Sequence, residues 1–161
     1  MRLRSVDEGD LEVYYRIYCD PAVMDHLGGV QPRDSIPEKL SRHAAKAAND
    51  QSWISMIVSD DPPGNAGIVS IGWHGGLAEI GWAVLPEYQG RGVGKAAVRL
   101  LLDRAAADGR WGVLHAFPGI DNGASNGICR SLGFTLLGEQ DAEFAGKLFR
   151  GNHWVIDPTA T

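Results

Sequence analysis

The segment from Glu79 to Gly94 (EIGWAVLPEYQGRGVG) joins a strand-like run to a glycine-rich turn that opens a helix. Gly90, Gly92 and Gly94 alternate in the turn, and residues without side chains let a ligand approach the backbone closely. The first turn of a helix offers unpaired N–H groups and the positive end of the helix dipole. This segment therefore predicts a site for a phosphate or pyrophosphate just beyond the end of a strand.

The spacing of these glycines excludes two common phosphate-binding loops. A P-loop needs Ser or Thr after Gly-Lys, whereas Gly94-Lys95 is followed by Ala96. A Rossmann fingerprint needs its third glycine one residue later than Gly94. The pattern that remains is Gln89-x-x-Gly92-x-Gly94. By itself, this pattern is also compatible with a turn that only shapes the chain.

A second motif, NGASNGICRSLGF at positions 122–134, follows the strand-like run 111–117. Together the two motifs resemble the acetyl-CoA pyrophosphate loop and the later N-x-x-S/A…G-F element of the GNAT superfamily of N-acetyltransferases. Their order, with one helix and one strand between them, is also that of the family. The segments 20–27 (DPAVMDHL) and 78–82 (AEIGW) resemble the branch that acetylates ribosomal-protein alanines. The resemblance covers nearly the whole chain and is weakest at 138–146.

Length and composition bound the alternatives. The 161 residues suit one domain, 1–161, and 44% hydrophobic with 22% charged residues is ordinary for a globular protein. The formal net charge of −5 argues against a nucleic-acid partner and mildly favours a cationic one. Cys19 and Cys129 lack CxxC or histidine spacing, so we expect free thiols and no metal. No apolar run is long enough for a membrane span or signal peptide, so we expect a cytoplasmic protein.

Hydrophobic periodicity predicts seven strands and several helices. The strands are expected at 1–6, 53–58, 66–73, 77–84, 111–117, 134–138 and 148–156. The helices are expected after Asp7, at 21–27, 36–49, 92–107 and 122–132, with a capping box formed by Ser35 and Glu38. In the helix at 92–107, Val93, Ala97, Leu100 and Leu101 are expected to face the core.

The resemblance implies an α/β fold of the GNAT type with three layers. Its mixed, mostly antiparallel sheet has about seven strands, splays between strands 4 and 5, and is flanked by helices. It also implies that acetyl-CoA is the co-substrate and that pantetheine lies in the wedge between the splayed strands. The cofactor residues carried over are Trp82, Ala83 and Val84 for pantetheine, Gln89, Gly90, Arg91, Gly92, Val93 and Gly94 for the pyrophosphate, Lys95 for added charge, and Asn122 and Ser125 on the later helix. Lys95 and Arg91 are alternatively parts of a solvated surface.

Glu79 is the candidate general base, because apolar neighbours on its strand raise a carboxyl pKa toward a useful range. Ser125 is the candidate group that hydrogen-bonds the leaving sulfur, as the resemblance to the ribosomal branch implies. Many superfamily members place a tyrosine acid seven residues after the motif asparagine, where this chain has Cys129. His115 is the auxiliary candidate base. The structural alternatives are a solvent-facing Glu79 and a Ser125 that only satisfies helix backbone.

We expect an acetyl-CoA-dependent N-acetyltransferase that transfers the acetyl group directly to a primary amine. The alternatives are a catalytically silent acyl-CoA-binding sensor or regulatory module, and transfer through a covalent intermediate on Cys129. The acceptor pocket is expected from segment 20–37, the hairpin at His74 and a loop at 139–148. A peptide or protein N-terminus, a polyamine and a small amine all remain open as acceptors, and so does a homodimer. The pocket segments carry carboxylates that suit a cation: Asp25, Asp34, Glu139, Asp141 and Glu143.

Overall fold

Strands far apart in sequence meet in one mixed sheet in the computed structural model, which describes residues 1–144 and 147–160. Within these residues the sheet has seven strands in the order β1-β2-β3-β4-β5-β7-β6. All neighbours pair antiparallel except β4 and β5, which are parallel. The predicted mixed sheet is thereby confirmed. The strands are β1 (Arg2–Ser5), β2 (Trp53–Asp60), β3 (Pro63–His74), β4 (Leu77–Val84), β5 (Leu114–Ala116), β6 (Thr135–Phe144) and β7 (Lys147–Ile156).

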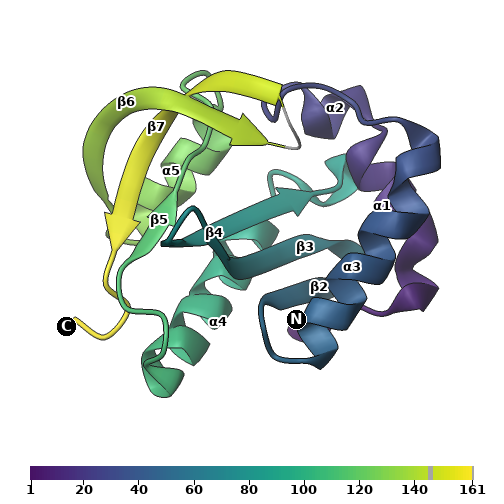
Figure 1. The fold of residues 1–161 in the computed structure, drawn as a ribbon, viewed down its shortest axis with the longest axis horizontal. Coiled ribbons are helices and arrows are strands. Elements are labelled where there is room, and N and C mark those ends of the chain that lie inside the picture. Colours follow the sequence, from purple (N-terminus) through teal and green to yellow (C-terminus); the bar gives the residue numbers. More distant parts are fainter. Residues whose placement is uncertain (145–146, 161) are drawn as a thin grey trace.

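Helices flank the sheet on both faces (Figure 1). The α-helices are α1 (Leu11–Tyr18), α2 (Pro21–Met24), α3 (Ile36–Ala48), α4 (Val93–Asp108) and α5 (Gly123–Ser131), and short 3-10 turns lie at Glu8–Asp10, Arg33–Ser35 and Pro86–Tyr88. Helices α1 and α3 pack against the first three strands, and α4 packs against β3 and β4. Because side chains alternate along β4, this strand presents one set to α4 and α5 and the other set to the opposite face.

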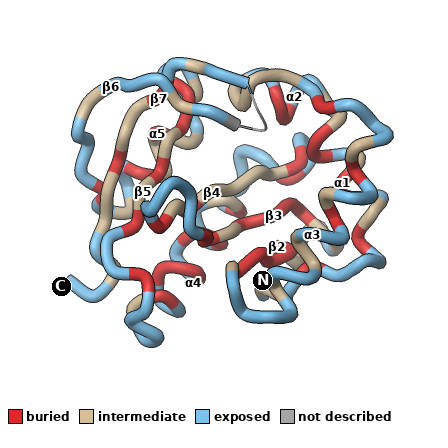
Figure 2. The backbone as a smooth tube through the Cα atoms, in the orientation of Figure 1, coloured by how far each residue is buried: buried red, intermediate tan, exposed pale blue. Residues whose placement is uncertain are grey.

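The buried core lies between the first four strands and helices α1, α3 and α4 (Figure 2). Its largest fully buried side chains include Tyr14 and Ile17 from α1, Ile71 from β3, Ile80 from β4 and Leu101 from α4. In contrast, much of β6 is exposed. The part of the sheet that precedes β5 is therefore the better buried part.

Two local predictions are wrong. The capping box does not form at Ser35, whose backbone is helical and whose hydroxyl donates to the Pro32 carbonyl at 2.6 Å. A capping box requires an extended N-cap residue, and the one that forms joins Asp7 to Asp10. In α4, Leu100 is 41% exposed whereas Val98 is fully buried. The 3.6-residue period carries the apolar stripe through Val98 and past Leu100.

Two strand boundaries also differ from the prediction. The run 111–117 contains only the short β5 within the described residues, because Trp111 leaves the sheet and packs edge-on against Trp53, 5.4 Å between ring centroids. The expected loop at 139–148 is instead mostly strand, since β6 continues to Phe144 and β7 begins at Lys147. Residues 145 and 146, which belong to that expected loop, lie outside the described residues.

Candidate active site

A cavity of about 940 Å³ opens where β5 diverges from β4. The parallel pairing joins Ala78 to Leu114 and Glu79 to His115, and the strand continues to Val84 beyond it. Figure 1 shows the divergence as a change of direction between β2–β4 and the group β5, β7 and β6. The predicted splay between strands 4 and 5 is present, and it leaves an edge of β4 facing the cavity.

The glycine-rich turn lies at one end of this cavity and leads into α4. Gly92 is the N-cap in the left-handed region at φ +78°, and Gly90 has φ +73°. The first intrahelical bond runs from the Ala96 N–H to the Gly92 carbonyl, which leaves the preceding helical N–H groups for a ligand. An anion placed here would also meet the positive end of the α4 dipole. The turn therefore has the backbone geometry that a pyrophosphate requires.

The side chains of the turn divide into two groups. Gln89, Gly90 and the stretch from Gly92 to Lys95 line the cavity. Arg91 is not among the lining residues, because its Nε donates to the Glu87 carbonyl at 3.2 Å. Gly94 has a packing role as well, since a Cβ there would lie 3.1 Å from the Cδ1 of Ile128 on α5. Close packing between α4 and α5 thus gives a second reason for glycine at this position.

The edge of β4 that we expect to meet pantetheine comprises Trp82, Ala83 and Val84, and all three line the cavity. The Val84 carbonyl accepts a hydrogen bond from Gln89 Nε2 at 2.8 Å. The indole Nε1 of Trp82 donates to Ser125 Oγ at 3.2 Å. Trp82 is therefore both an edge residue of β4 and a direct contact of the candidate sulfur-binding hydroxyl.

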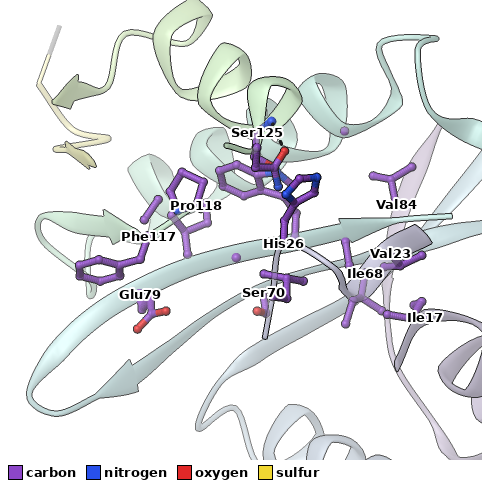
Figure 3. Close-up of a pocket in the computed structure, with 18 of the residues that line it drawn as sticks. Ile17, Val23, His26, Ile68, Ser70, Glu79, Val84, Phe117, Pro118 and Ser125 are labelled. Atoms are coloured by element: carbon purple, nitrogen blue, oxygen red, sulfur yellow. Dashed lines mark hydrogen bonds between the residues drawn. The ribbon is translucent and has the colours of Figure 1, made fainter. Parts of the chain in front are cut away.

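Glu79 lines the cavity from the face of β4 opposite to Trp82. Figure 3 shows its carboxylate on one side of the strand and Ser125 on the other, with Phe117 near the carboxylate. Burial raises the pKa of the Glu79 carboxyl, and the nearby His74 partly opposes this shift. A half-buried carboxyl group with a raised pKa in a cleft has the properties of a general base.

Helix α5 positions Ser125. Asn122 is the N-cap of α5. The Asn122 side-chain oxygen accepts a hydrogen bond from the Ser125 N–H at 3.1 Å, so the predicted capping role is confirmed. The sequence analysis missed the next asparagine, Asn126, which is buried. Its amide donates to the carbonyls of Gly119 and Asn122 and accepts from Asn152 and Trp154 at 2.9 and 2.8 Å. The four-residue spacing of two asparagines on one helix face was the available signal.

The remaining candidates lie in settings that do not favour chemistry. Cys129 is fully buried, and burial raises the pKa of its thiol to about 12, so the thiolate is scarce at neutral pH. His115 Nδ1 lies 2.8 Å from His153 Nε2, and the two rings stack. Among the described residues there is no group of three or more His, Cys, Asp or Glu side chains that could hold a metal ion.

The expected acceptor carboxylates are only partly brought together. Asp141 and Glu143 line the cavity, whereas Asp25, Asp34 and Glu139 are not among its lining residues. A residue that the sequence analysis passed over, His26, also lines it, with its Nδ1 3.1 Å from Asp121 Oδ1.

No helix in the described part of the chain is both long and apolar enough to cross a membrane.

Residues 1–135 match the family model described as "Acetyltransferase (GNAT) domain". The chain belongs to the GNAT acetyltransferase family. Solved structures with the same fold include RimL, a ribosomal L7/L12 alpha-N-protein acetyltransferase in complex with coenzyme A. It is 21% identical with a TM-score of 0.82, and the match covers 99% of this chain and 94% of that one.

Two further GNAT-fold structures carry the cofactor or its disulfide. RimJ from Mycobacterium smegmatis, in complex with CoA-disulfide, is 24% identical with a TM-score of 0.76 over 96% of this chain and 80% of that one. The putative acetyltransferase yncA from Salmonella typhimurium, with acetyl-CoA, is 21% identical with a TM-score of 0.76 over 100% and 95%. The prediction of a GNAT-type acetyltransferase that uses acetyl-CoA is confirmed.

Proposed function

We propose that this GNAT enzyme transfers an acetyl group directly from acetyl-CoA to a primary amine, with Glu79 as the general base. The observation that carries the proposal is the position of Glu79, half-buried in the cavity beside the free edge of β4. Burial that raises the pKa of this carboxyl makes it a stronger proton acceptor than an exposed glutamate.

The reaction needs one proton to leave the amine and one to reach the sulfur. Glu79 takes a proton from the ammonium form of the acceptor, directly or through water. The amine nitrogen then forms a bond to the thioester carbonyl carbon, and the C–S bond breaks as the tetrahedral intermediate collapses. The second nitrogen proton is released, and the coenzyme A thiolate is protonated. N–H groups at the free edge of β4 are suited to polarise the carbonyl.

Ser125 serves the leaving group in this proposal. Its hydroxyl accepts from Trp82 Nε1, which leaves its own proton free for a donated hydrogen bond to the thiolate. Because Ser125 and Glu79 lie on opposite sides of β4, proton removal and sulfur stabilisation occur at different places (Figure 3). The buried, protonated Cys129 favours direct transfer over a covalent acetyl-cysteine intermediate.

The decisive experiment compares the wild-type enzyme with Glu79→Gln. We expect kcat to fall by about a hundredfold, the usual contribution of a positioned base, with acetyl-CoA affinity nearly unchanged. Acetyl-CoA should raise the melting temperature of both proteins, because a ligand that binds only the native state stabilises it. Release of coenzyme A thiol measures turnover, and a thermal melt measures binding.

Ser125→Ala is the matched variant on the other side of the strand, and it should lower the rate only modestly because water can replace its hydroxyl. Full activity of Glu79→Gln at neutral pH would refute the base assignment. If acetyl-CoA binds but no amine in a broad panel is acetylated, the silent acyl-CoA-binding module becomes the better interpretation.

A further inference from the structure

One wall of the cavity is basic. Lys39, His43 and Lys46 occupy positions i, i+4 and i+7 of α3, so they share one helix face, and all three line the cavity. Lys39 is half-buried, with its Nζ 5.0 Å from the centre of the Tyr18 ring, and Lys46 is exposed. Within the described residues neither lysine forms an ion pair, whereas Arg42 on the same helix pairs with Glu38.

The charge of this wall at neutral pH comes from the two lysines. The His43 Nδ1 lies 2.7 Å from the Tyr14 hydroxyl. Burial lowers the pKa of His43 to about 4, and the nearby cations Lys39, Arg42, Lys46 and His74 reinforce the shift. His43 is therefore neutral. Burial and then Arg42 lower the pKa of Lys39, so a nearby anion would stabilise its charged form.

The basic wall lies near Glu79 rather than near the pyrophosphate turn. At the end of α3, the Ser52 N–H donates to the Lys46 carbonyl at 3.4 Å. The Ser52 Oγ lies 3.0 Å from the point where a Cβ on Gly72 would stand, and Gly72 is the cross-strand partner of Glu79. The glycine turn follows the other end of β4, and the five residue steps from Glu79 to Val84 span about 17 Å. Lys46 thus lies at the Glu79 end of β4, and Lys39 lines the same cavity about two helical turns earlier on α3.

Two acidic residues besides Glu79 line the cavity, Asp141 and Glu143, and among the described residues neither forms an ion pair with these lysines. Asp141 is engaged by Arg150, whose NH1 lies 3.2 Å from its Oδ1. An ammonium group that is half removed from water without a counter-charge is unfavourable, and an anion that hydrogen-bonds to it restores the lost interaction. The cavity therefore combines the half-buried Glu79, suited to an amine, with two lysines that, in the described part of the chain, form no ion pair with Asp141 or Glu143, the other lining carboxylates.

We propose that the acceptor carries its primary amine and an anionic group, a carboxylate or a phosphate, on the same small molecule. Glu79 receives the amine, and Lys39 and Lys46 bind the anion. This inference rests on the proposed function, because it assumes that the amine reacts beside Glu79. It makes polyamines poor acceptors, since their second ammonium group would meet the basic wall.

The test compares acceptors that differ only in the distal group, using purified enzyme and acetyl-CoA. The panel contains ω-amino carboxylates of increasing chain length, their neutral amides, aminoalkyl phosphates and diamines. We expect the acids or the phosphates to exceed the amides in kcat/KM by about tenfold or more, as a charge-assisted contact would give. Whether carboxylates or phosphates are preferred identifies the anion.

Two variants and one control connect the preference to the lysines. Lys39→Met and Lys46→Met keep most of the length of the side chain, remove its charge, and should abolish most of the preference, with a much larger loss of kcat/KM for the acids than for the amides. Arg42→Met, on the same helix but outside the cavity lining, should leave the preference intact. Thermal melts with acetyl-CoA verify that each variant is folded.

Equal rates for acids and amides, or a faster reaction with diamines, would overturn the inference. So would an equal loss for acids and amides in Lys39→Met. If no amine is acetylated, the proposed function fails, and calorimetry then decides the inference separately. With coenzyme A present, the acids should bind more tightly than the amides, and Lys39→Met should remove the difference; equal binding would refute it.

Discussion

Strand β4 separates two regions that are held together in different ways. On one side β3 pairs with all of β4, from Gly67–Val84 to His74–Leu77, and apolar side chains fill the space under α1, α3 and α4. On the other side β5 contributes three residues and pairs with β4 at Ala78 and Glu79. We call residues 2–84 the N-terminal region and residues 114–156 the C-terminal region.

The C-terminal region uses a polar centre where the N-terminal region uses packing. Asn126 joins α5 to the preceding loop and to β7 through four hydrogen bonds to Gly119, Asn122, Asn152 and Trp154. The active-site cavity is thus a consequence of the incomplete pairing between β4 and β5. A fully paired β4–β5 edge would leave no backbone groups for a ligand.

The largest effect is expected at Gly67, where β3 lies against β4. A Cβ at this position would stand 2.1 Å from the Ala83 carbonyl oxygen, and the φ of +157° disfavours any side chain. Gly67→Val should therefore lower the free energy of unfolding by at least about 4 kcal/mol, because strand backbone must shift. Urea unfolding followed by circular dichroism measures the change.

Gly123→Ala is the control in the C-terminal region, because a Cβ there meets nothing within 4 Å. It should leave the free energy of unfolding within about 0.5 kcal/mol of wild type in the same urea experiment. If Gly67→Val is as stable as this control, the N-terminal region is less tightly packed than the comparison requires.

The second prediction removes the polar centre of the C-terminal region. Asn126→Ala leaves Trp154 Nε1, which is in a buried side chain, without its acceptor, and the Gly119 and Asn122 carbonyls each keep only a backbone hydrogen bond. Stranded buried polar groups each destabilise a fold, so we expect a loss of about 3 kcal/mol. Asn152→Ala, which removes one of these bonds, should have less than half of this effect in the same urea experiment. Equal effects would show that Asn126 is not the centre of the network.

The sequence predicted β2 to β4, the glycine turn, α4 and the cap of α5 well because their signals are local. Short, mostly apolar runs mark β2 to β4, and the 3.6-residue stripe with a terminal Gly109 marks α4. The glycine turn and the Asn122 cap were likewise visible as motifs. The leucine placed on the wrong face of α4 shows the limit of this method, since one residue of phase error moves a side chain by 100°.

Most of the features that the sequence did not predict depend on contacts between distant segments, and one depends on a competing local turn. The length of β6 depends on its register with β7, from Thr135–Val155 to Phe144–Lys147. The Ser35 cap failed because Arg33–Ser35 forms its own 3-10 turn. Nothing in the sequence singled out Lys39, and only the cavity shows that it lines the same site as Glu79. Sequence patterns identify faces of elements, not the partner that a face will meet.

The third prediction is that acid lowers the free energy of unfolding through His43 in the N-terminal region. Burial lowers the pKa of His43 to about 4, whereas the unfolded chain binds this proton near the ordinary value of 6.5. The stabilisation is thus complete above about pH 6.5 and is lost as the pH falls toward 4. His43→Gln should flatten this part of the stability profile by on the order of 2 kcal/mol.

Urea unfolding at several pH values between 4 and 7 measures the flattening, and His26→Gln is the control. The His26 side chain is 40% exposed, so His26→Gln removes a histidine from the surface and shows how much of any change is specific to the buried position. A wild-type profile that is already flat over this range would contradict the buried, neutral state of His43.

The smallest effect is expected at Gly127, in the less tightly packed C-terminal region. Gly127 lies inside α5 with ordinary helical backbone, and a Cβ there meets nothing within 4 Å. Gly127→Ala should raise stability by about 0.5–1 kcal/mol, because alanine loses less backbone entropy than glycine on entering a helix. The same change at Gly94 in α4 should give no gain, since its Cβ would stand 3.1 Å from Ile128. Calorimetric melting temperatures measure both variants. A higher melting temperature for Gly94→Ala and an unchanged one for Gly127→Ala would contradict this prediction. It would mean that the contact between α4 and α5 has room for a methyl group, whereas the surroundings of Gly127 do not.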